Sequence, residues 1–397
     1  MLPEIIIALI IGILAGTFTG LIPGIHINLV GALLLSISAI LLNLISPTIL
    51  IIFIVAMAIT HTFIDFIPSI FLGAPDEDTI LAILPGHDLL KKGQGYQAIT
   101  LATYGSTAAI LVILLITPIF IFTLSKIEPT IKFLIPYLLI ISTIFLISKE
   151  KYKLTAIIVF TLSGFLGIGV FNSSVNQPFL PMLSGLFGAS SLIISIKTKV
   201  IIPKQKLNQI KIKLKTLAKP VLASAITSPL CCFLPGIGSG QAAVLGTSLI
   251  TPTKKNFLIL LGATNTIVLG LSFIVFYTIS KARTGMAATL TEITIKITTN
   301  QVLIILATIC LTGIICYHWT LFLGKQFSKH INKINYTFLS LTILLIISTL
   351  VLIFTGFFGF FIFIISTAIG IFGILSNVKR INLMGCLIVP IVLTYLL

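Results

Sequence analysis

Two ionisable side chains, His61 and Asp65, lie four residues apart inside a long apolar stretch of the chain. This spacing places both groups on one face of an α-helix. Ionisable groups are costly in lipid and usually face the interior of a helix bundle. Asp65 could therefore hold a proton or Na⁺ as a coupling ion, and His61 could contact a substrate or carry a proton. The alternative is structural, with Asp65 nearer a cytoplasmic mouth and His61 a hydrogen-bonded polar group of the core.

A related polar triplet lies in the second half of the chain, where Thr264-Asn265-Thr266 parallels Thr60-His61-Thr62. Its hydroxyl and amide oxygens could contribute to a Na⁺ site near broken backbone. The sequence favours neither H⁺ nor Na⁺ as the coupling ion, and it predicts no other cofactor and no bound metal. The predicted ion-coupling residues are His61, Asp65, Thr264, Asn265 and Thr266.

Helix-breaking pairs occur once in each half of the chain, at Pro23-Gly24 and Pro235-Gly236. Proline removes a backbone donor and glycine weakens a helix, so each pair predicts an interruption. Interrupted backbone at membrane depth is tolerated only where protein or a watery cavity covers it. Two interruptions in corresponding positions indicate the central site of a transporter. The alternative is that both pairs are packing kinks that bind nothing.

The residues around these breaks suit a small anion. A helix that restarts after a break begins with unpaired N–H groups and the positive end of its dipole, so two opposed starts can bind an anion without a charged side chain. Glycine permits close approach of the backbone, and Ser, Asn and Gln hydrogen-bond carboxylate oxygens. The predicted substrate-binding residues are Pro23, Gly24, His26, Asn28, Pro235, Gly236, Gly238, Ser239, Gly240 and Gln241.

Other candidate chemistry is weaker. The acidic loop at 73–88 does not have the ligand spacing of an EF-hand, so it is better interpreted as a solvated cytoplasmic loop or a gate. The five cysteines lie in apolar stretches without metal-ligand spacing, which predicts small buried residues and no disulfide. Asp65 is the one carboxylate expected within a span, whereas intramembrane aspartyl proteolysis needs two. The sequence therefore predicts that the protein is not an enzyme.

The composition is that of a polytopic membrane protein, with 57% hydrophobic and 9% charged residues and a mean hydropathy of +1.21. The net charge of +16 is better explained by a positive-inside bias than by nucleic-acid binding. Segment 197–219 carries eight Lys and no acidic residue, which places it in the cytoplasm. We therefore expect a multi-pass protein of the cytoplasmic membrane.

The fold class predicted from this pattern is an all-α polytopic membrane protein with an inverted-topology repeat. It comprises about ten spanning helices and two hairpins broken at the Pro-Gly pairs. The repeats are expected at 1–196 and 221–397, joined by a basic cytoplasmic linker at 197–220. The expected helical segments are 2–21, 30–45, 47–73, 100–124, 129–148, 154–171, 177–196, 221–234, 240–250, 257–279, 301–323, 337–355, 359–376 and 383–397.

The inverted repeat follows from the lysine distribution. Lysine-rich loops fall on one side only if 221–250 enters and leaves the membrane on the same face, as a re-entrant hairpin broken at Pro235-Gly236 would do. Its expected arms are too short to cross. The hairpin broken at Pro23-Gly24 then opens from the opposite side, although its longer arms leave two tilted full spans as an alternative.

Three tracts make the chain resemble a known family. They are the paired Pro-Gly-Ile breaks, the run from Leu84-Pro-Gly-His to Lys91-Lys-Gly-Gln-Gly95, and Leu183-Ser-Gly-Leu-Phe-Gly188. Together they resemble TctA, the large membrane subunit of the tripartite tricarboxylate transporters, in its shorter archaeal-type branch. The resemblance covers most of the chain and implies a permease for organic anions such as carboxylates, driven by an ion gradient. It also implies two partners, a small membrane subunit and an extracellular binding protein.

The function expected from the sequence is secondary active transport of a small carboxylate by alternating access. The expected contacts are membrane lipid and the anionic substrate, with no nucleic acid. Two alternatives stay open. The same helix-terminus site would suit a carrier for a lipid-linked phosphate, and the protein could instead be a membrane scaffold that transports nothing.

Overall fold

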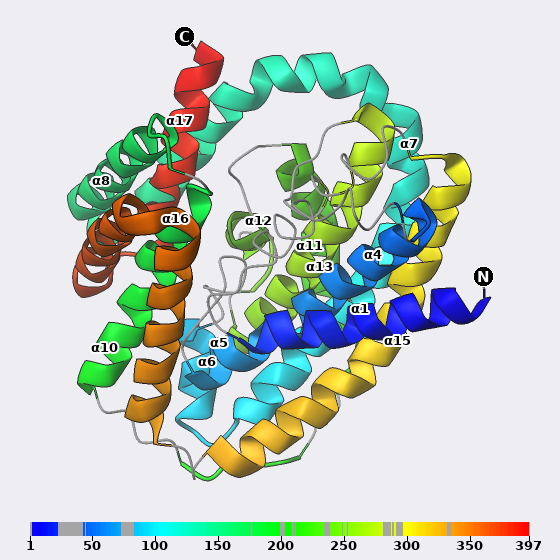
Figure 1. The fold of residues 1–397 in the computed structure, drawn as a ribbon, viewed down its shortest axis with the longest axis horizontal. Helices are drawn as coiled ribbons and strands as arrows, with labels where there is room; N and C mark the ends of the chain where they lie inside the picture. Colours follow the sequence, from blue (N-terminus) through cyan, green and yellow to red (C-terminus); the bar gives the residue numbers. More distant parts are fainter. Residues whose placement is uncertain are drawn as a thin grey trace.

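The computed structural model describes residues 2–22, 43, 45–72, 83–175, 177–198, 203–208, 210, 212–233, 239–247, 249–251, 253–280, 287, 290, 297–331 and 335–396. Every regular element in these ranges is a helix (Figure 1). Within the described residues, seven helices are long and apolar enough to cross a membrane. The all-helical membrane fold predicted from the sequence is therefore confirmed, while the expected total of about ten spans stays a prediction.

The first-half helices are α1 (Leu2–Leu21), α4 (Pro47–Ile64), α5 (Phe66–Leu72), α6 (Ile83–Leu90), α7 (Gly95–Ser148), α8 (Lys153–Phe171), α9 (Phe179–Leu183), the π-helix η2 (Ser184–Ala189) and α10 (Ser190–Thr198). The second-half helices are α11 (Leu214–Phe233), α12 (Ser239–Thr247), α13 (Lys254–Ile279), α15 (Thr299–His330), α16 (Tyr336–Leu375), the 3₁₀ helix η4 (Arg380–Met384) and α17 (Gly385–Leu396). The expected segment 30–45 lies almost entirely outside the described residues.

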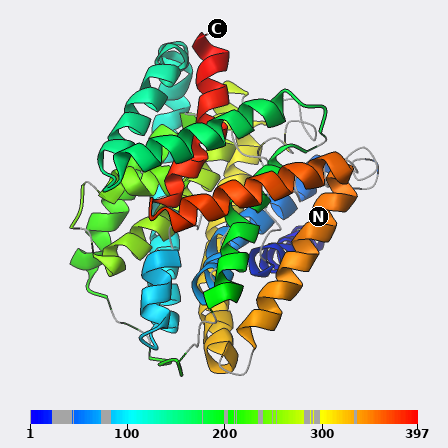
Figure 2. The ribbon, with the colours of Figure 1, turned by 90° about the vertical axis from the view of Figure 1, so that its left-hand side faces the viewer.

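One predicted pair of spans is joined into a single helix, while another keeps the break that was predicted between its members. The expected break between 124 and 129 is wrong, because α7 is continuous over 54 residues and curves through this stretch instead of ending (Figure 1). In α16, Gly356 has φ 66° and ψ −170°, which interrupts the helix between the two expected spans. Only glycine adopts this backbone region readily. Figure 2 shows the two arms of α16 diverging sharply at the kink.

The start of the second half also differs from the prediction. Helix α11 begins at Leu214 and has 20 residues, so it starts inside the segment expected to be linker. The first arm of this hairpin is therefore longer than the short arm expected from 221. Lys, Leu and Ala are strong helix formers, which explains why the basic sequence before Pro220 joins the helix.

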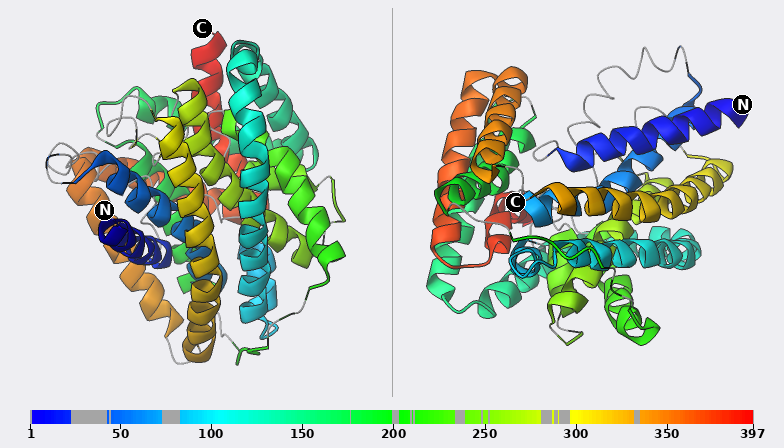
Figure 3. Two further views of the ribbon diagram at one scale, coloured as in Figure 1. Left: turned by 90° about the vertical axis from the view of Figure 1, so that its right-hand side faces the viewer. Right: turned by 90° about the horizontal axis from the view of Figure 1, so that it is seen from below.

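Helices α4 and α13 form the centre of the molecule. In the most apolar windows of the spans at Pro47–Phe71 and Lys254–Ile279, 89% and 94% of residues are buried, against 17–39% for the other five candidate spans. Helix α1 packs on α4 and α7 packs on α13, while α15 contacts both α4 and α7. Figure 3 shows α7 and α15 as long neighbouring helices beside this centre.

Glycines allow the close approach of these helices. A Cβ at Gly105 of α7 would lie 2.0 Å from the carbonyl oxygen of Ile259, and one at Gly262 of α13 would lie 2.2 Å from that of Ala102. On α1, a Cβ at Gly16 would lie 2.3 Å from the Met57 carbonyl oxygen. Small residues at such positions let helix backbones pack in lipid, where no hydrophobic force drives helices together.

The tract Lys91-Lys-Gly-Gln-Gly95 forms a turn that holds the linker. Gly93 has φ 73° and ends α6 in the left-handed conformation, for which glycine is preferred. Its carbonyl oxygen accepts a 2.7 Å hydrogen bond from the Lys206 N–H. The Gln205 side chain accepts from the Gly95 N–H at 2.8 Å and donates to the Leu90 carbonyl at 3.1 Å. The linker is thus bound to the first half.

A second contact between the halves surrounds Glu150, between α7 and α8. Its buried carboxylate accepts hydrogen bonds from the Lys379 N–H at 3.2 Å and the Asn382 amide at 3.0 Å. Nearby, the Arg380 guanidinium donates to the Ser191 hydroxyl at 2.6 Å. Burial lowers the pKa of Arg380 to about 10, so this arginine keeps its charge at neutral pH.

Candidate functional site

The five predicted ion-coupling residues lie on the two central helices, and all are buried. His61 is on α4, and Asp65 is the first residue after the end of α4. Thr264, Asn265 and Thr266 are on α13. The exposed fractions of these five residues range from 0 to 4%. Two side-chain hydrogen bonds join the polar residues of one helix directly to those of the other, so these residues lie at the same level along the two helices.

The first bond joins Asn265 to Asp65. The Asn265 Nδ2 donates to the Asp65 Oδ2 at 2.8 Å, and each residue is 2% exposed. The second bond, between the hydroxyls of Thr62 and Thr266, is 3.1 Å long. A buried polar group is tolerated when it is hydrogen-bonded, and both of these bonds lie in the interior of the molecule.

His61 contacts a different helix. Its Nδ1 lies 3.1 Å from the hydroxyl oxygen of Thr19 on α1. Although His61 and Asp65 are one helical turn apart, these two contacts lead to different helices, α1 for the histidine and α13 for the carboxylate. We refer to the six residues that make these contacts as the central polar cluster: Thr19, His61, Thr62, Asp65, Asn265 and Thr266.

Asp65 lies at a change in the helical backbone, between the end of α4 and the start of α5. Pro68 follows it within one turn and has no N–H to donate to the Ile64 carbonyl four residues earlier. The Asp65 carbonyl accepts bonds from the N–H and the hydroxyl of Ser69, at 3.3 and 2.7 Å. The proline thus explains why the helix changes at the carboxylate.

Helix α15 adds polar residues that sequence reasoning missed. The Cys316 thiol donates to the Thr60 hydroxyl at 3.2 Å, and the Trp319 indole N–H donates to the Thr17 hydroxyl at 3.0 Å. The buried hydroxyls of Thr312 and Thr320 have no hydrogen-bond partner in the part of the chain that the structure describes. Trp319 is the single tryptophan of the chain. Its position inside an apolar span is the feature of the sequence that could have indicated a polar contact on this helix.

The predicted substrate residues are described only in part. Seven of them lie outside the described residues: Pro23, Gly24, His26, Asn28, Pro235, Gly236 and Gly238. Ser239 and Gly240 are buried and begin α12, and Gln241 is in its first turn. Because α11 ends at Phe233 and α12 begins at Ser239, a new helix does start after the Pro235-Gly236 pair.

The chemistry available in the cluster is that of oxygen ligands and one imidazole. A carboxylate and several hydroxyls suit a proton or a hard cation and do not suit a soft transition metal. Within the described ranges, no three His, Cys, Asp or Glu side chains converge to hold a metal ion. Among the described cysteines, Cys232, Cys310, Cys316 and Cys386 form no disulfide.

Comparison with known proteins agrees with this architecture. The model of the tripartite tricarboxylate transporter TctA family matches residues 6–385. A protein of Methanocaldococcus jannaschii described as uncharacterized is 33% identical over 401 aligned positions, which cover 98% of each chain. No solved structure matches the chain. Since the family match extends over nearly the whole chain, the protein belongs to the tripartite tricarboxylate transporter TctA family and is a membrane permease component of that transport system.

Proposed function

We propose that the protein is a secondary active permease of small organic anions, most simply carboxylates, in the cytoplasmic membrane. It works by alternating access coupled to H⁺ or Na⁺. The observation that carries the proposal is the hydrogen bond between Asp65 and Asn265, buried between the central helices of the two halves. A carboxylate in this position can change its charge or its cation as the halves move, which is what ion coupling requires.

The helix contacts support an inverted-topology repeat. In the proposed correspondence, α1, α4 and α7 of the first half match α11, α13 and α15 of the second. Helix α1 packs on α4 as α11 packs on α13, and α7 packs on α13 as α15 packs on α4. These pairings are reciprocal, as two related halves wrapped around a shared centre would give.

The start of α12 supports a substrate site. Its first residues, Ser239 and Gly240, are buried and follow the break after α11. Helix α12 contacts α13, the helix that carries Asn265. The positive end of α12 would attract a carboxylate, and the helix expected after Pro23-Gly24 would supply the opposed start.

Membership of a tripartite family implies association with other subunits. We propose a small membrane subunit and an extracellular binding protein as these partners. The partner proteins would deliver the anion to the outer face, while the permease described here would carry the substrate and ion sites.

Uptake by purified protein in lipid vesicles tests the proposal. Vesicles are loaded with or without H⁺ and Na⁺ gradients and offered labelled di- and tricarboxylates or polyprenyl phosphates, with and without the accessory proteins. We expect carboxylate accumulation that needs one of the two gradients. Flux of the lipid phosphate alone would replace the carboxylate assignment, and no flux of any anion under all conditions would refute transport.

A further inference from the structure

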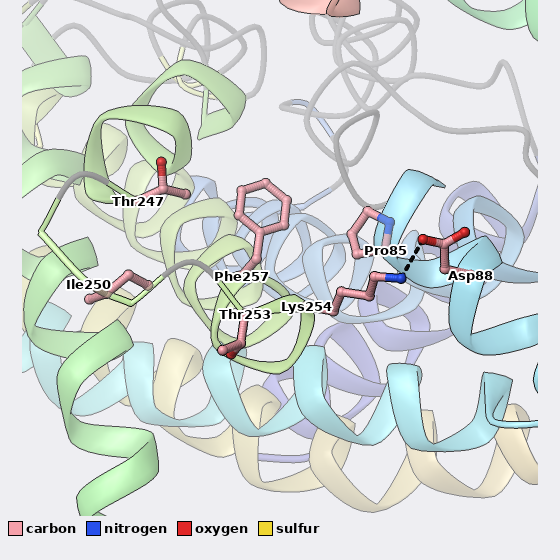
Figure 4. Close-up of a pocket in the computed structure, with 7 residues that line it drawn as sticks. All are labelled: Pro85, Asp88, Thr247, Ile250, Thr253, Lys254 and Phe257. Carbon is pink, nitrogen blue, oxygen red and sulfur yellow. Dashed lines mark hydrogen bonds and ion pairs between the residues drawn. The ribbon is translucent and has the colours of Figure 1, made fainter. Parts of the chain in front are cut away.

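A separate cavity lies away from the central polar cluster, between α6, the end of α12 and the start of α13. Its volume is about 270 Å³. Sites for drug-sized molecules occupy roughly 300–1,000 Å³, so this cavity suits a smaller solute. Pro85 and Phe257 contribute apolar walls, and Thr247 and Thr253 contribute hydroxyl groups. Figure 4 shows these side chains around the cavity together with one lysine and one aspartate.

The charged residues of the cavity bind each other. Lys254 Nζ lies 2.5 Å from Asp88 Oδ2, and this ion pair links α6 of the first half to α13 of the second (Figure 4). The two side chains are 48% and 50% exposed. An ion pair so accessible to water contributes little to stability, because water and salt compete with it. Another carboxylate can therefore replace Asp88 at low cost.

The surroundings of Lys254 favour a carboxylate. Lys254 is the first residue of α13, and the Thr253 hydroxyl caps this helix by accepting from the Asn256 N–H at 3.2 Å. The positive end of the helix dipole adds to the ammonium charge. The carboxylate of Asp88 already pairs with this ammonium group, so the chain supplies an internal example of a carboxylate held in the cavity.

We propose that this cavity is a vestibular site for the transported carboxylate, and that Asp88 occupies it as an internal competitor. The proposal rests on the proposed function, since it takes the same class of anion as the ligand. A carboxylate of the substrate binds Lys254, Asp88 is released, and the link between α6 and α13 opens. Because α13 also carries Asn265, binding at its first residue acts on the same helix as the proposed ion-coupling contact.

Paired charge variants test this site by transport kinetics in vesicles, with the carboxylate offered on the face that carries Asp88 and Lys254. Asp88→Asn removes the competitor, and the KM for the carboxylate should fall by about fivefold, the equivalent of one exposed ion pair. Lys254→Gln removes the binding charge, and the KM should rise by about tenfold, typical for a lost charge-assisted bond. In the Lys254→Gln background, Asp88→Asn should have no further effect, because the competition has already been removed.

Lys255→Gln is the matched control, because it removes the neighbouring lysine of the same helix turn outside the cavity. Its KM should equal that of the unaltered protein. A lowered KM in Asp88→Asn cannot result from misfolding, so that variant keeps the test decisive if Lys254→Gln folds poorly. If the unaltered protein transports carboxylates while Asp88→Asn and Lys254→Gln both behave like Lys255→Gln, the vestibular site is refuted and the proposed function stands. If the unaltered protein moves no anion, the proposed function is refuted, and the vestibular site that rests on it is refuted as well.

Discussion

Asp65 and Asn265 are 200 positions apart in the sequence, yet the Asn265 amide donates a 2.8 Å hydrogen bond to the Asp65 carboxylate. The bond joins the two helices with the most buried spans, one from each half of the chain. Any movement of one half past the other must change this contact. Under the proposed function, this contact links the protonation or cation occupancy of Asp65 to the conformation of the protein, which is the basis of our first two predictions.

Replacing Asp65 by Asn should remove coupling. The variant keeps the size of the side chain but can neither accept a proton nor balance a cation at neutral pH. We expect carboxylate uptake to lose its response to an imposed H⁺ or Na⁺ gradient, with the accumulation rate lowered by at least about tenfold, as for a charged group lost from a buried site. Uptake with each gradient applied separately measures this. A variant that still accumulates substrate with a full gradient response would show that the ion binds elsewhere.

Exchanging the two residues should restore part of the function. The double variant Asp65→Asn with Asn265→Asp keeps one carboxylate and one amide in the same contact but moves the charge to α13. We expect a response to the gradient that is larger than in Asp65→Asn alone, because coupled neighbours give non-additive effects. The single variant Asn265→Asp, with two facing carboxylates, is the control and should be the least stable. No difference between the double variant and Asp65→Asn would argue against a shared site.

Enlarging Gly105 should separate α7 from α13. A Cβ there would lie 2.0 Å from the Ile259 carbonyl oxygen, so Gly105→Ala forces two backbones apart. We expect a loss of about 1–3 kcal/mol in stability, seen as a lower midpoint of thermal unfolding in detergent. Gly169→Ala is the control, since a Cβ at Gly169 meets nothing within 4 Å. Equal midpoints for the two variants would contradict the observed helix contact.

The stability of the junction around Glu150 should depend on the acceptor oxygen of the Glu150 side chain and not on the charge of that side chain. Glu150→Gln retains an oxygen for the Lys379 N–H and the Asn382 amide, so its unfolding midpoint should stay close to that of the unaltered protein. Glu150→Leu leaves the Lys379 N–H without this acceptor and should cost about 1–3 kcal/mol. Thermal unfolding of both variants side by side decides the point, and an equal loss in both would assign the effect to the charge.

The sequence was informative where a residue type conflicts with its surroundings. Asp65 and Asn265 could be placed in the interior because polar groups in an apolar span seek protein partners. A helix start after Pro235-Gly236 was also predictable, and α12 begins there at Ser239. These inferences need only local composition and the cost of exposing polar groups to lipid.

The contacts between distant helices were not predictable in the same way. Nothing local to His61 indicates that its partner is Thr19, and nothing local to Thr60 indicates Cys316. Such pairs depend on which helices pack together and at what depth. The continuity of α7 was missed for another reason, since the composition around Pro129 is equally compatible with a bend and with two separate helices.

The hydrogen bonds between the Gly93 turn and the linker at Lys206 have a consequence for motion. A connection between two repeats would serve as a loose tether if it were bound to neither. Here the Gln205 side chain and the Lys206 N–H fasten it to the first half. In the proposed transport cycle, the linker would therefore serve as an anchored pivot for the second half, close to the end of α6.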